Sequence, residues 1–472
     1  MQRLLVSAAH KSSGKTTLAT GLVAALVDRG MAVQPFKKGP DYIDPMWLSL
    51  AAGRPCINLD PYLMEPAALA RAFVQALQGA DMALVEGNKG LYDGLALDGS
   101  NSNAALAKTL GLPVLLVIDA RGMTRGIAPM LLGYQAFDRG VHIGGVLLNR
   151  VGGSRHEAKL RAVIEHYTDL PVLGAVAEQP ELAMTERHLG LMPCAEVADA
   201  AAWVQQVGRR LAQQVDLHKV QALIASAGPL PADLPAWVPM PVPCGTRVRI
   251  GIARDRAFGF YYADDLAALQ AAGAELVPID TLHDTQLPSI DGLFIGGGFP
   301  EACMADIEAN APLRHAMRQA IEGGLPTHAE CGGLMLLARS VHWRGRSAQM
   351  VGAIPADVLM HDRPVGRGYV HLQETGASPW GAGDGSLLRG HEFHHSSLVN
   401  LDPGLRFAYR VQRGHGIDGQ HDGVCVHNLV ASYTHLRTGA GSRWAPRFVD
   451  FVRHTRASTA CVGASTALAQ AA

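Results

Sequence analysis

The sequence has almost no net charge, few aromatic residues and no long apolar run. Its 41 Lys and Arg residues balance 42 Asp and Glu residues, which leaves a formal net charge of −1. This balance argues against the basic surface that nucleic acids or anionic membranes select. The longest apolar stretches, such as residues 113–120, fall well short of the roughly 20 residues that span a bilayer. We therefore predict neither a nucleic-acid partner nor a membrane partner.

Cysteine is scarce and scattered. The seven cysteines are an odd number, and none forms a CxxC pair or a zinc-ligand spacing. The apolar run after Met1 is also too short for a signal peptide. These features predict reduced thiols and a cytoplasmic protein.

The length and the apolar pattern predict an α/β fold. A chain of 472 residues with 48% apolar content is long enough for two or three domains. Aromatic residues make up only 6%, which disfavours a β-sandwich. In the first half, short apolar runs alternate with amphipathic stretches, and this predicts a parallel sheet covered by helices. The expected strands are residues 4–8, 32–36, 82–86, 113–119, 142–149 and 172–176, with helices at residues 16–29, 65–78 and 154–166.

Prolines divide the chain. Six prolines between positions 229 and 243 interrupt any regular element, so we predict an extended linker over residues 214–246. Periodicity resumes afterwards in a second α/β unit. The expected domains are thus residues 1–213 and 247–455, and residues 456–472 are expected to be a disordered tail.

A phosphate-binding loop follows the first expected strand. The segment AHKSSGKT opens a helix, the context in which backbone N–H groups and a helix N-terminus wrap phosphates. The first glycine of the usual GxxxxGK[ST] pattern is replaced by Ala9. The predicted ATP-binding residues are Ser12, Ser13, Gly14, Lys15, Thr16 and Thr17.

Two acidic segments follow the next strands, at the sheet edge where ligands of parallel sheets bind. They are KKGPDYIDP from position 37 and VEGNKGLYDG from position 85. Glu86 ends an apolar strand, as a Walker-B carboxylate does. We predict a Mg²⁺ site at Thr16, Asp41 and Glu86. The expected substrate-binding residues are Lys37, Tyr42, Tyr92 and Asp93.

A cysteine at a strand-to-helix elbow indicates a nucleophile in the second half. Cys331 lies in THAECGGLM, where a sharp turn exposes the sulfur and a helix dipole lowers its pKa. The expected oxyanion donors are Gly332 and the glycine loop at Gly297 and Gly298. The base must be a histidine. Both HEFHH from position 391 and ASYTH ending at His435 are candidates from the residues alone.

These motifs together resemble the cobyrinic acid a,c-diamide synthase family. GPDYIDP, EGNKGLYDG, FIGGGFPE, AECGGLM and ASYTHL occur in the family's order over about residues 3–455. The resemblance implies a dethiobiotin-synthetase-like P-loop domain followed by a class I glutamine amidotransferase domain. It also implies amidation of the a and c side-chain carboxylates of a corrin ring in cobalamin biosynthesis, with ATP, Mg²⁺ and glutamine.

Carried over by motif, Cys331 is the nucleophile and His435 is the base. The class I pattern continues His-x-Glu, whereas here Leu436 and Arg437 follow, so that carboxylate is missing from its usual place. The rival assignments are the sister enzymes for hydrogenobyrinate or nickel sirohydrochlorin. A ParA/MinD-like ATPase switch is a rival of another class, but it has no use for a cysteine elbow. The expected assembly is a monomer or a homodimer.

Overall fold

The computed structural model describes the whole chain except residues 183, 185, 188–189, 239–244, 440–441 and 471–472. The chain divides into two units, Met1–Val238 and Pro239–Ala472. Within the described residues, no helix has both the length and the apolar character needed to cross a membrane.

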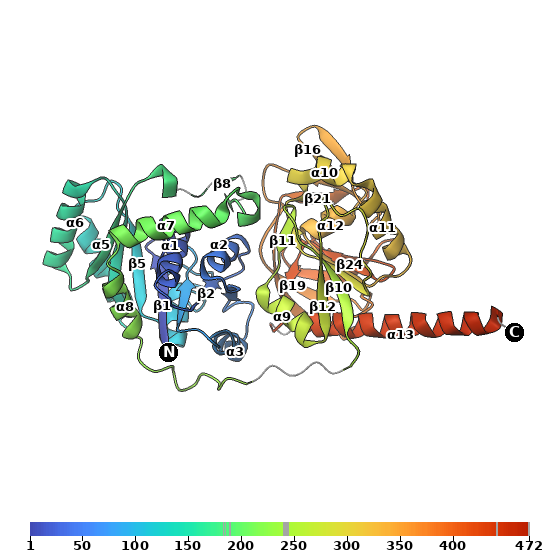
Figure 1. The fold of residues 1–472 in the computed structure, drawn as a ribbon, viewed down its shortest axis with the longest axis horizontal. Helices are drawn as coiled ribbons and strands as arrows, with labels where there is room; N and C mark the ends of the chain where they lie inside the picture. Colours follow the sequence, from blue (N-terminus) through green and yellow to red (C-terminus); the bar gives the residue numbers. More distant parts are fainter. Residues whose placement is uncertain (183, 185, 188–189, 239–244, 440–441, 471–472) are drawn as a thin grey trace. The chain divides into compact units, whose positions relative to one another are not determined.

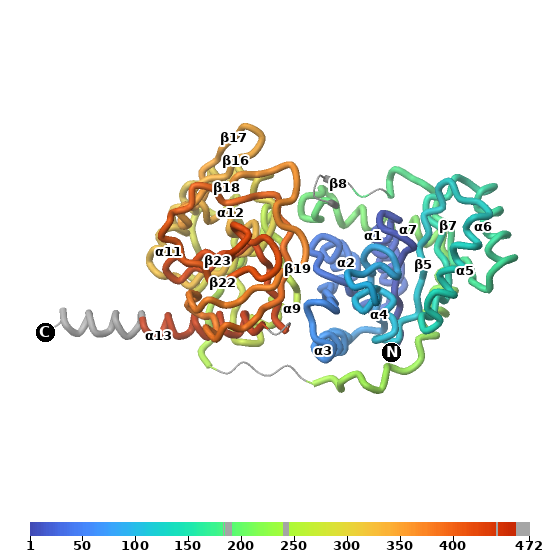
Figure 2. The backbone as a smooth tube through the Cα atoms, turned by 180° about the vertical axis from the view of Figure 1, so that it is seen from behind, coloured from blue at the N-terminus to red at the C-terminus, as the bar shows by residue number. Residues whose placement is uncertain are grey.

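The first unit is built on a seven-stranded, all-parallel sheet. Figures 1 and 2 show several of its strands and the helices around them from two sides. The connection after β1 runs toward one edge of the sheet, and the connection after its neighbour β4 runs toward the other edge. This reversal creates a topological switch point at the carboxyl ends of the two strands. In sheet order the strands are β3 (Ile57–Leu59), β2 (Val33–Lys38), β4 (Met82–Glu86), β1 (Gln2–Ala8), β5 (Val114–Asp119), β6 (Ile143–Val151) and β7 (Val172–Ala177).

Helices cover both faces of this sheet. One apolar core lies beneath α1 (Lys15–Val27), α2 (Ile43–Ala52), α7 (Ala200–Gln214) and α8 (Leu217–Ala225). The other lies beneath α3 (Pro66–Ala76), α4 (Asn103–Leu110), α5 (Ile127–Phe137) and α6 (Ser154–Tyr167). A small hairpin joins β8 (Glu186–Arg187) to β9 (Gly190–Leu191). Because both faces are covered, the central strands are continuously apolar rather than alternating.

The second unit contains a ten-stranded mixed sheet. Its first five strands in sheet order are parallel: β12 (Ala274–Ile279), β10 (Val248–Ala253), β13 (Gly292–Ile295), β15 (Thr327–Glu330) and β24 (Leu429–Ser432). The remaining strands are antiparallel: β23 (His421–Val426), β22 (Arg406–Arg413), β19 (Gly366–Glu374), β20 (Leu387–His394) and β25 (His435–Leu436). The predicted α/β class is therefore confirmed in both units.

Smaller elements complete the second unit. A four-stranded sheet is formed by β17 (Arg346–Gln349), β16 (Ser340–Trp343), β18 (Asp357–Met360) and β21 (Ser396–Val399), and β11 (Phe258–Phe260) pairs with β14 (Gly297–Gly298). One core contains side chains of α10 (Met304–Ala309), α11 (Ala311–Glu322) and α12 (Gly332–Leu337). The other contains side chains of α9 (Ala263–Ala271) and α13 (Trp444–Gln470).

Two expected irregular segments are partly helical. The range 214–246 expected to be a linker contains α8, because Asp216 caps the helix and an apolar face of Leu217, Val220 and Ile224 is buried. Pro239, Pro241 and Pro243 of that range lie outside the described residues. The tail expected to be disordered from residue 456 continues α13 as far as Gln470. Its alanine content favours a helix, and disorder of this tail stays a prediction.

Candidate functional site

The predicted phosphate loop lies between β1 and α1, and its backbone enters the left-handed region at Ser12 (φ 61°) and Gly14 (φ 82°). A Cβ atom on Gly14 would come 2.3 Å from Asn149 Nδ2, which donates a 2.8 Å hydrogen bond to the Ser13 carbonyl. The Ser13 hydroxyl donates to the His10 carbonyl at 2.7 Å. These contacts hold the loop directly before the first turn of α1, and the N-terminus of a helix is where phosphates bind in such loops.

Lys15 is the first residue of α1 and is buried. Its Nζ donates a 2.7 Å hydrogen bond to the Lys89 carbonyl, which lies in the loop after β4. Burial, together with the nearby charge of Lys37, lowers the pKa of Lys15 to about 8. Because the Lys15 ammonium group is poorly hydrated, any anion that binds in the loop stabilises it. Thr17 follows in the first turn of α1 and is half-buried.

Thr16 lies against two carboxylates. Its Oγ1 is 2.8 Å from Glu86 Oε1 and 3.1 Å from Asp44 Oδ2. Lys37 Nζ lies between the same groups, 3.0 Å from Glu86 Oε1 and 2.5 Å from Asp44 Oδ2. The structure therefore brings together two of the three predicted metal ligands, Thr16 and Glu86. The carboxylate that contacts Thr16 from the GPDYIDP segment is Asp44, and not Asp41.

Asp41 stabilises the start of α2 instead. Its Oδ1 accepts hydrogen bonds from the backbone N–H groups of Ile43 (3.0 Å) and Asp44 (3.1 Å). Its Oδ2 lies 3.9 Å from Lys37 Nζ, farther than the carboxylates of Glu86 and Asp44 lie from the same ammonium group. Burial, and then the charge of Asp44, raise the pKa of Asp41 to about 7. Both aspartates lie in one short segment of the sequence. Which of them contacts Thr16 depends on where α2 begins, and the sequence pattern alone does not show this.

The oxygen atoms around Thr16 suit a hard divalent cation. Among the residues that the structure describes, no three His, Cys, Asp or Glu side chains are grouped as metal ligands. Within that part of the chain, however, the buried Glu86 Oε2 has no hydrogen-bond partner, and burial raises the pKa of Glu86. Burial alone would lower the pKa of Lys37, but Asp44 and Glu86 outweigh it and raise that pKa. A hydroxyl and two carboxylates beside a phosphate loop are a donor set that Mg²⁺ accepts, completed by phosphate oxygens and water.

The other predicted substrate residues lie at the same carboxyl edge. Tyr42 is buried. The Tyr92 hydroxyl donates to the Tyr134 carbonyl at 2.6 Å, and Asp93 Oδ2 accepts from the Gly90 N–H at 2.9 Å. These contacts shape the loop after β4. A substrate-binding role for these residues stays a prediction.

In the second unit, Cys331 occupies the expected elbow between β15 and α12. Its backbone has φ 49° and ψ −104°, an unusual conformation for a residue with a side chain. The Cys331 N–H donates to the Ser432 carbonyl at 2.7 Å, which fixes the turn. The residue is 7% exposed, and its Sγ lies 3.9 Å from the Phe393 carbonyl oxygen. The thiol is thus held at a strained turn with limited access to solvent.

The three predicted oxyanion glycines surround this elbow. A Cβ atom on Gly332 would come 2.8 Å from the backbone nitrogen of Gly298, and one on Gly297 would come 2.8 Å from His435 Cε1. A larger residue at either position would displace the loop or the imidazole. The structure therefore brings Gly297, Gly298 and Gly332 together beside Cys331 and His435.

His435 contacts the thiol. Its imidazole forms a hydrogen bond with the Cys331 side chain, and its Nδ1 lies 3.2 Å from Glu330 Oε2. Burial would lower the pKa of His435, but the hydrogen bonds with Cys331 and Glu330 outweigh it and raise that pKa to about 10. The pair is therefore suited to form a thiolate and an imidazolium, the reactive state of a nucleophilic cysteine. Glu330 was not predicted, although it precedes Cys331 in the motif AECGGLM.

The competing histidines have other partners. His391 stacks on His435, with ring centroids 5.0 Å apart, and its Nδ1 lies 3.2 Å from the Tyr262 hydroxyl. Burial, and then the charge of His435, lower the pKa of His391 well below its usual value. His394 stacks on Tyr433 with a centroid distance of 3.9 Å. The choice of His435 as the base thus agrees with its contact to sulfur.

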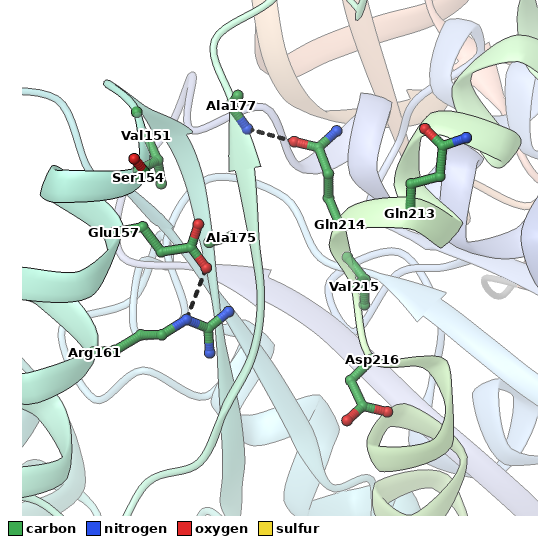
Figure 3. Close-up of a pocket in the computed structure, with 11 residues that line it drawn as sticks. Val151, Ser154, Glu157, Arg161, Ala175, Ala177, Gln213, Gln214, Val215 and Asp216 are labelled. Carbon is green, nitrogen blue, oxygen red and sulfur yellow. Dashed lines mark hydrogen bonds and ion pairs between the residues drawn. The ribbon is translucent and has the colours of Figure 1, made fainter.

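A surface pocket of about 510 Å³ lies elsewhere in the first unit, beside β6, β7, α6 and α7 (Figure 3). Glu157 and Arg161 on its wall pair at 2.8 Å, and Gln214 Oε1 accepts from the Ala177 N–H at 2.9 Å. None of the predicted site residues lines this pocket, and we assign it no role in the chemistry.

Comparison with known proteins adds an independent line of evidence. Residues 249–442 match the CobB/CobQ-like glutamine amidotransferase domain family, and residues 2–186 match the AAA domain family. A cobyrinate a,c-diamide synthase of Magnetococcus marinus is 47% identical over 96% of this chain and 97% of its own length. A cobyrinate a,c-diamide synthase of Methanosarcina acetivorans is 38% identical over 97% of both chains.

The chain belongs to the cobyrinate a,c-diamide synthase family. Another relative with that name, from Methanothermobacter thermautotrophicus, is 38% identical over 94% of this chain. The resemblance inferred from the motifs is therefore confirmed, as is the order of a P-loop unit followed by a glutamine amidotransferase unit. The family assignment covers both the loop at Lys15 and the elbow at Cys331.

Proposed function

We propose that this protein is a ligase that uses ATP and glutamine to amidate the a and c side-chain carboxylates of cobyrinate in cobalamin biosynthesis. The observation that supports this most is the Cys331–His435 pair at a strained elbow, in a chain that also contains a phosphate loop. Relatives of nearly the same length are named cobyrinate a,c-diamide synthases. Residues 1–213 are the proposed ATP-using domain, and residues 247–455 are the proposed glutaminase domain.

The glutaminase reaction begins with the Cys331 thiolate. Sulfur attacks the side-chain carboxamide carbon of glutamine and forms a C–S bond. The His435 imidazolium gives its proton to the departing nitrogen, which leaves as ammonia when the C–N bond breaks. Water then attacks the resulting thioester while His435 takes one of its protons. Glutamate leaves, and the thiolate–imidazolium pair is restored.

Backbone N–H groups at the elbow stabilise the negative oxygen that develops in each step. The proposed donors are those of Gly297, Gly298 and Gly332. Their closeness to one another and to His435 supports this, since an added Cβ atom on Gly332 would come 2.8 Å from the Gly298 nitrogen and one on Gly297 would come 2.8 Å from His435 Cε1. Donors fixed in place before the reaction lower its barrier, because they need no reorganisation as charge develops.

The ligase reaction makes the substrate carboxylate reactive. A carboxylate oxygen attacks the γ-phosphorus of ATP, ADP leaves, and an acyl phosphate forms. Ammonia then attacks the acyl carbon, and phosphate leaves as the amide forms. Lys15 and the loop N–H groups bind and orient the phosphates. The cycle runs once for each of the two carboxylates.

Mg²⁺ is the proposed cation of this site, held by Thr16 and Glu86 together with Asp44 in place of the expected Asp41. When bound, it neutralises phosphate charge. The ring carboxylate is proposed to bind near Lys37, Tyr42, Tyr92 and Asp93, at the carboxyl edge of the sheet. The protein would act in the cytoplasm as a monomer or homodimer, with the corrin ring as its macrocyclic substrate.

Amidation of three macrocycles tests the proposal. The purified protein is incubated with ATP, Mg²⁺, glutamine and one of cobyrinate, hydrogenobyrinate or nickel sirohydrochlorin, and mass spectrometry counts the amidated carboxylates. We expect two amidations of cobyrinate. Conversion of only a rival ring would reassign the substrate, and ATP hydrolysis without amidation of any ring would favour a nucleotide switch.

A further inference from the structure

The position that carries a carboxylate in the class I pattern is occupied by a cation. Arg437, two residues after His435, is fully buried. Its Nη2 and Nε lie 2.6 Å and 3.1 Å from Asp264 Oδ2, and its guanidinium lies over the Tyr262 ring at 4.9 Å. A guanidinium is a donor only and carries the wrong sign of charge to stabilise an imidazolium. Arg437 therefore cannot replace the missing glutamate.

A carboxylate reaches His435 from the other side of the elbow. Glu330 is the last residue of β15, immediately before the nucleophile, and is 3% exposed. Its Oε2 lies 3.2 Å from His435 Nδ1. Its Oε1 accepts from the Leu436 N–H at 3.0 Å and lies 3.2 Å from His328 Nε2. Three contacts thus fix the orientation of this carboxylate.

These contacts determine the proton positions on His435. Burial would raise the pKa of Glu330, but hydrogen bonds from His328 and His435 outweigh it and lower that pKa to about 2. An ionised carboxylate only accepts hydrogen bonds, so His435 Nδ1 must carry a proton. The other ring nitrogen, Nε2, is then the one that exchanges a proton with Cys331.

We propose that Glu330 is the positioning residue of the glutaminase site. Although it lies immediately before the nucleophile in the chain, it takes the role of the carboxylate that is missing from the His-x-Glu pattern. This inference rests on the proposed glutaminase function of Cys331. Glu330 orients the His435 ring, selects its tautomer and stabilises the imidazolium that accompanies the thiolate. Its negative charge, and not only its hydrogen bonds, is required.

The test compares E330Q and E330D with the control E374Q. Glu374 is also a buried carboxylate of the second unit, bonded to the Gly383 N–H (2.9 Å) and paired with Arg447 (3.5 Å). Each variant is assayed for glutamine hydrolysis and for ring amidation with ammonium in place of glutamine. Iodoacetamide labelling of Cys331, followed by peptide mass spectrometry from pH 5 to 10, reports the thiolate directly.

We expect E330Q to lower kcat for glutamine hydrolysis by up to about 10⁴-fold, the loss seen when a triad histidine loses its orienting carboxylate. KM should change much less. Labelling of Cys331 should shift to higher pH, because a less stable imidazolium leaves less thiolate near neutrality. E330D should recover part of both effects, and E374Q should behave like the wild type.

Each other outcome is decisive. Wild-type kcat and an unchanged labelling profile in E330Q would overturn the inference while leaving the glutaminase proposal intact. Loss of ammonium-dependent amidation in E330Q as well would mean that Glu330 only supports the fold, and would also overturn it. A wild-type protein that hydrolyses no glutamine would refute the proposed function itself, and the inference with it.

Discussion

Lys15 is a cation with little access to water at the start of α1, and its pKa is lowered to about 8 by burial and by Lys37. Bound phosphates favour the ammonium form, so ATP binding must raise this pKa and take up a proton above pH 8. We expect ATP affinity to fall by up to about tenfold per pH unit between roughly pH 8 and pH 10. Calorimetric titration across this range measures the effect.

Two variants control this prediction. K15M should bind ATP weakly and lose the pH dependence. Lys108 is exposed and pairs with Asp138 at 2.6 Å, so K108M should keep both the affinity and its pH dependence. An ATP affinity of the wild type that stays constant from pH 7 to pH 9.5 would show that Lys15 does not contact the phosphates.

The two aspartates of GPDYIDP should differ in their effect on Mg²⁺. Asp44 contacts Thr16, whereas Asp41 caps the first turn of α2. We expect D44N to raise the Mg²⁺ concentration for half-maximal amidation at least about tenfold, as loss of a charged oxygen ligand implies. D41N should leave that Mg²⁺ concentration nearly unchanged, because an asparagine Oδ1 accepts the same backbone hydrogen bonds at the start of α2 about as well as an aspartate does. A larger Mg²⁺ effect for D41N than for D44N would restore the ligand set expected from the sequence.

At this scale, the sequence identified residues whose role depends on local chain geometry. Cys331 and the phosphate loop each follow a strand and open a helix, so their neighbours along the chain are sufficient to predict them. Glu330 and Asp44 were missed because their roles depend on contacts with distant residues, His435 and Thr16. The spacing of residues in a single sequence does not show which distant residues come into contact in the fold.

At the level of elements, the turn from β1 into α1 depends on a neighbouring strand. Gly14 has φ 82° and leaves room for Asn149 at the end of β6. We expect G14A to weaken ATP binding at least about tenfold, because the methyl group meets the Asn149 amide and the backbone resists this φ. The double variant G14A/N149A removes the steric conflict and should recover only part of the affinity. Equilibrium ATP binding measures both.

Gly30 provides the matched control. It has φ 83° just after α1, and nothing lies within 4 Å of an added Cβ atom. G30A should therefore destabilise the fold by about 1 kcal/mol, as expected for alanine at positive φ, without changing ATP affinity. Equal ATP binding by G14A and G30A would be inconsistent with a tightly packed phosphate loop.

Elements with strong periodicity were predicted from the sequence, and elements of ambiguous composition were not. The expected strand at residues 82–86 and the expected helix at residues 154–166 match β4 and α6 to within a residue. The sequence predicts a linker where α8 forms, because several prolines follow shortly after this segment. Its cap at Asp216 and its apolar spacing were the signals that could have found it.

The whole molecule combines a phosphate-loop unit and a glutamine amidotransferase unit in one chain. In the proposed function, a buried thiol paired with an imidazole releases ammonia from glutamine, and the phosphate-loop unit converts a carboxylate to an acyl phosphate. The order of these units could be predicted from the sequence because each has its own motif. The macrocycle could not, because selectivity for a ring depends on shape and on contacts from many segments.

The most direct test uses one variant and two nitrogen sources. C331S removes the thiol that is proposed to attack glutamine and changes no residue of the phosphate loop. With cobyrinate, ATP and Mg²⁺, we predict that C331S forms no diamide from glutamine and forms it from ammonium at a rate within about threefold of the wild type, since only the nitrogen supply is lost. Undiminished diamide formation from glutamine by C331S would contradict the account.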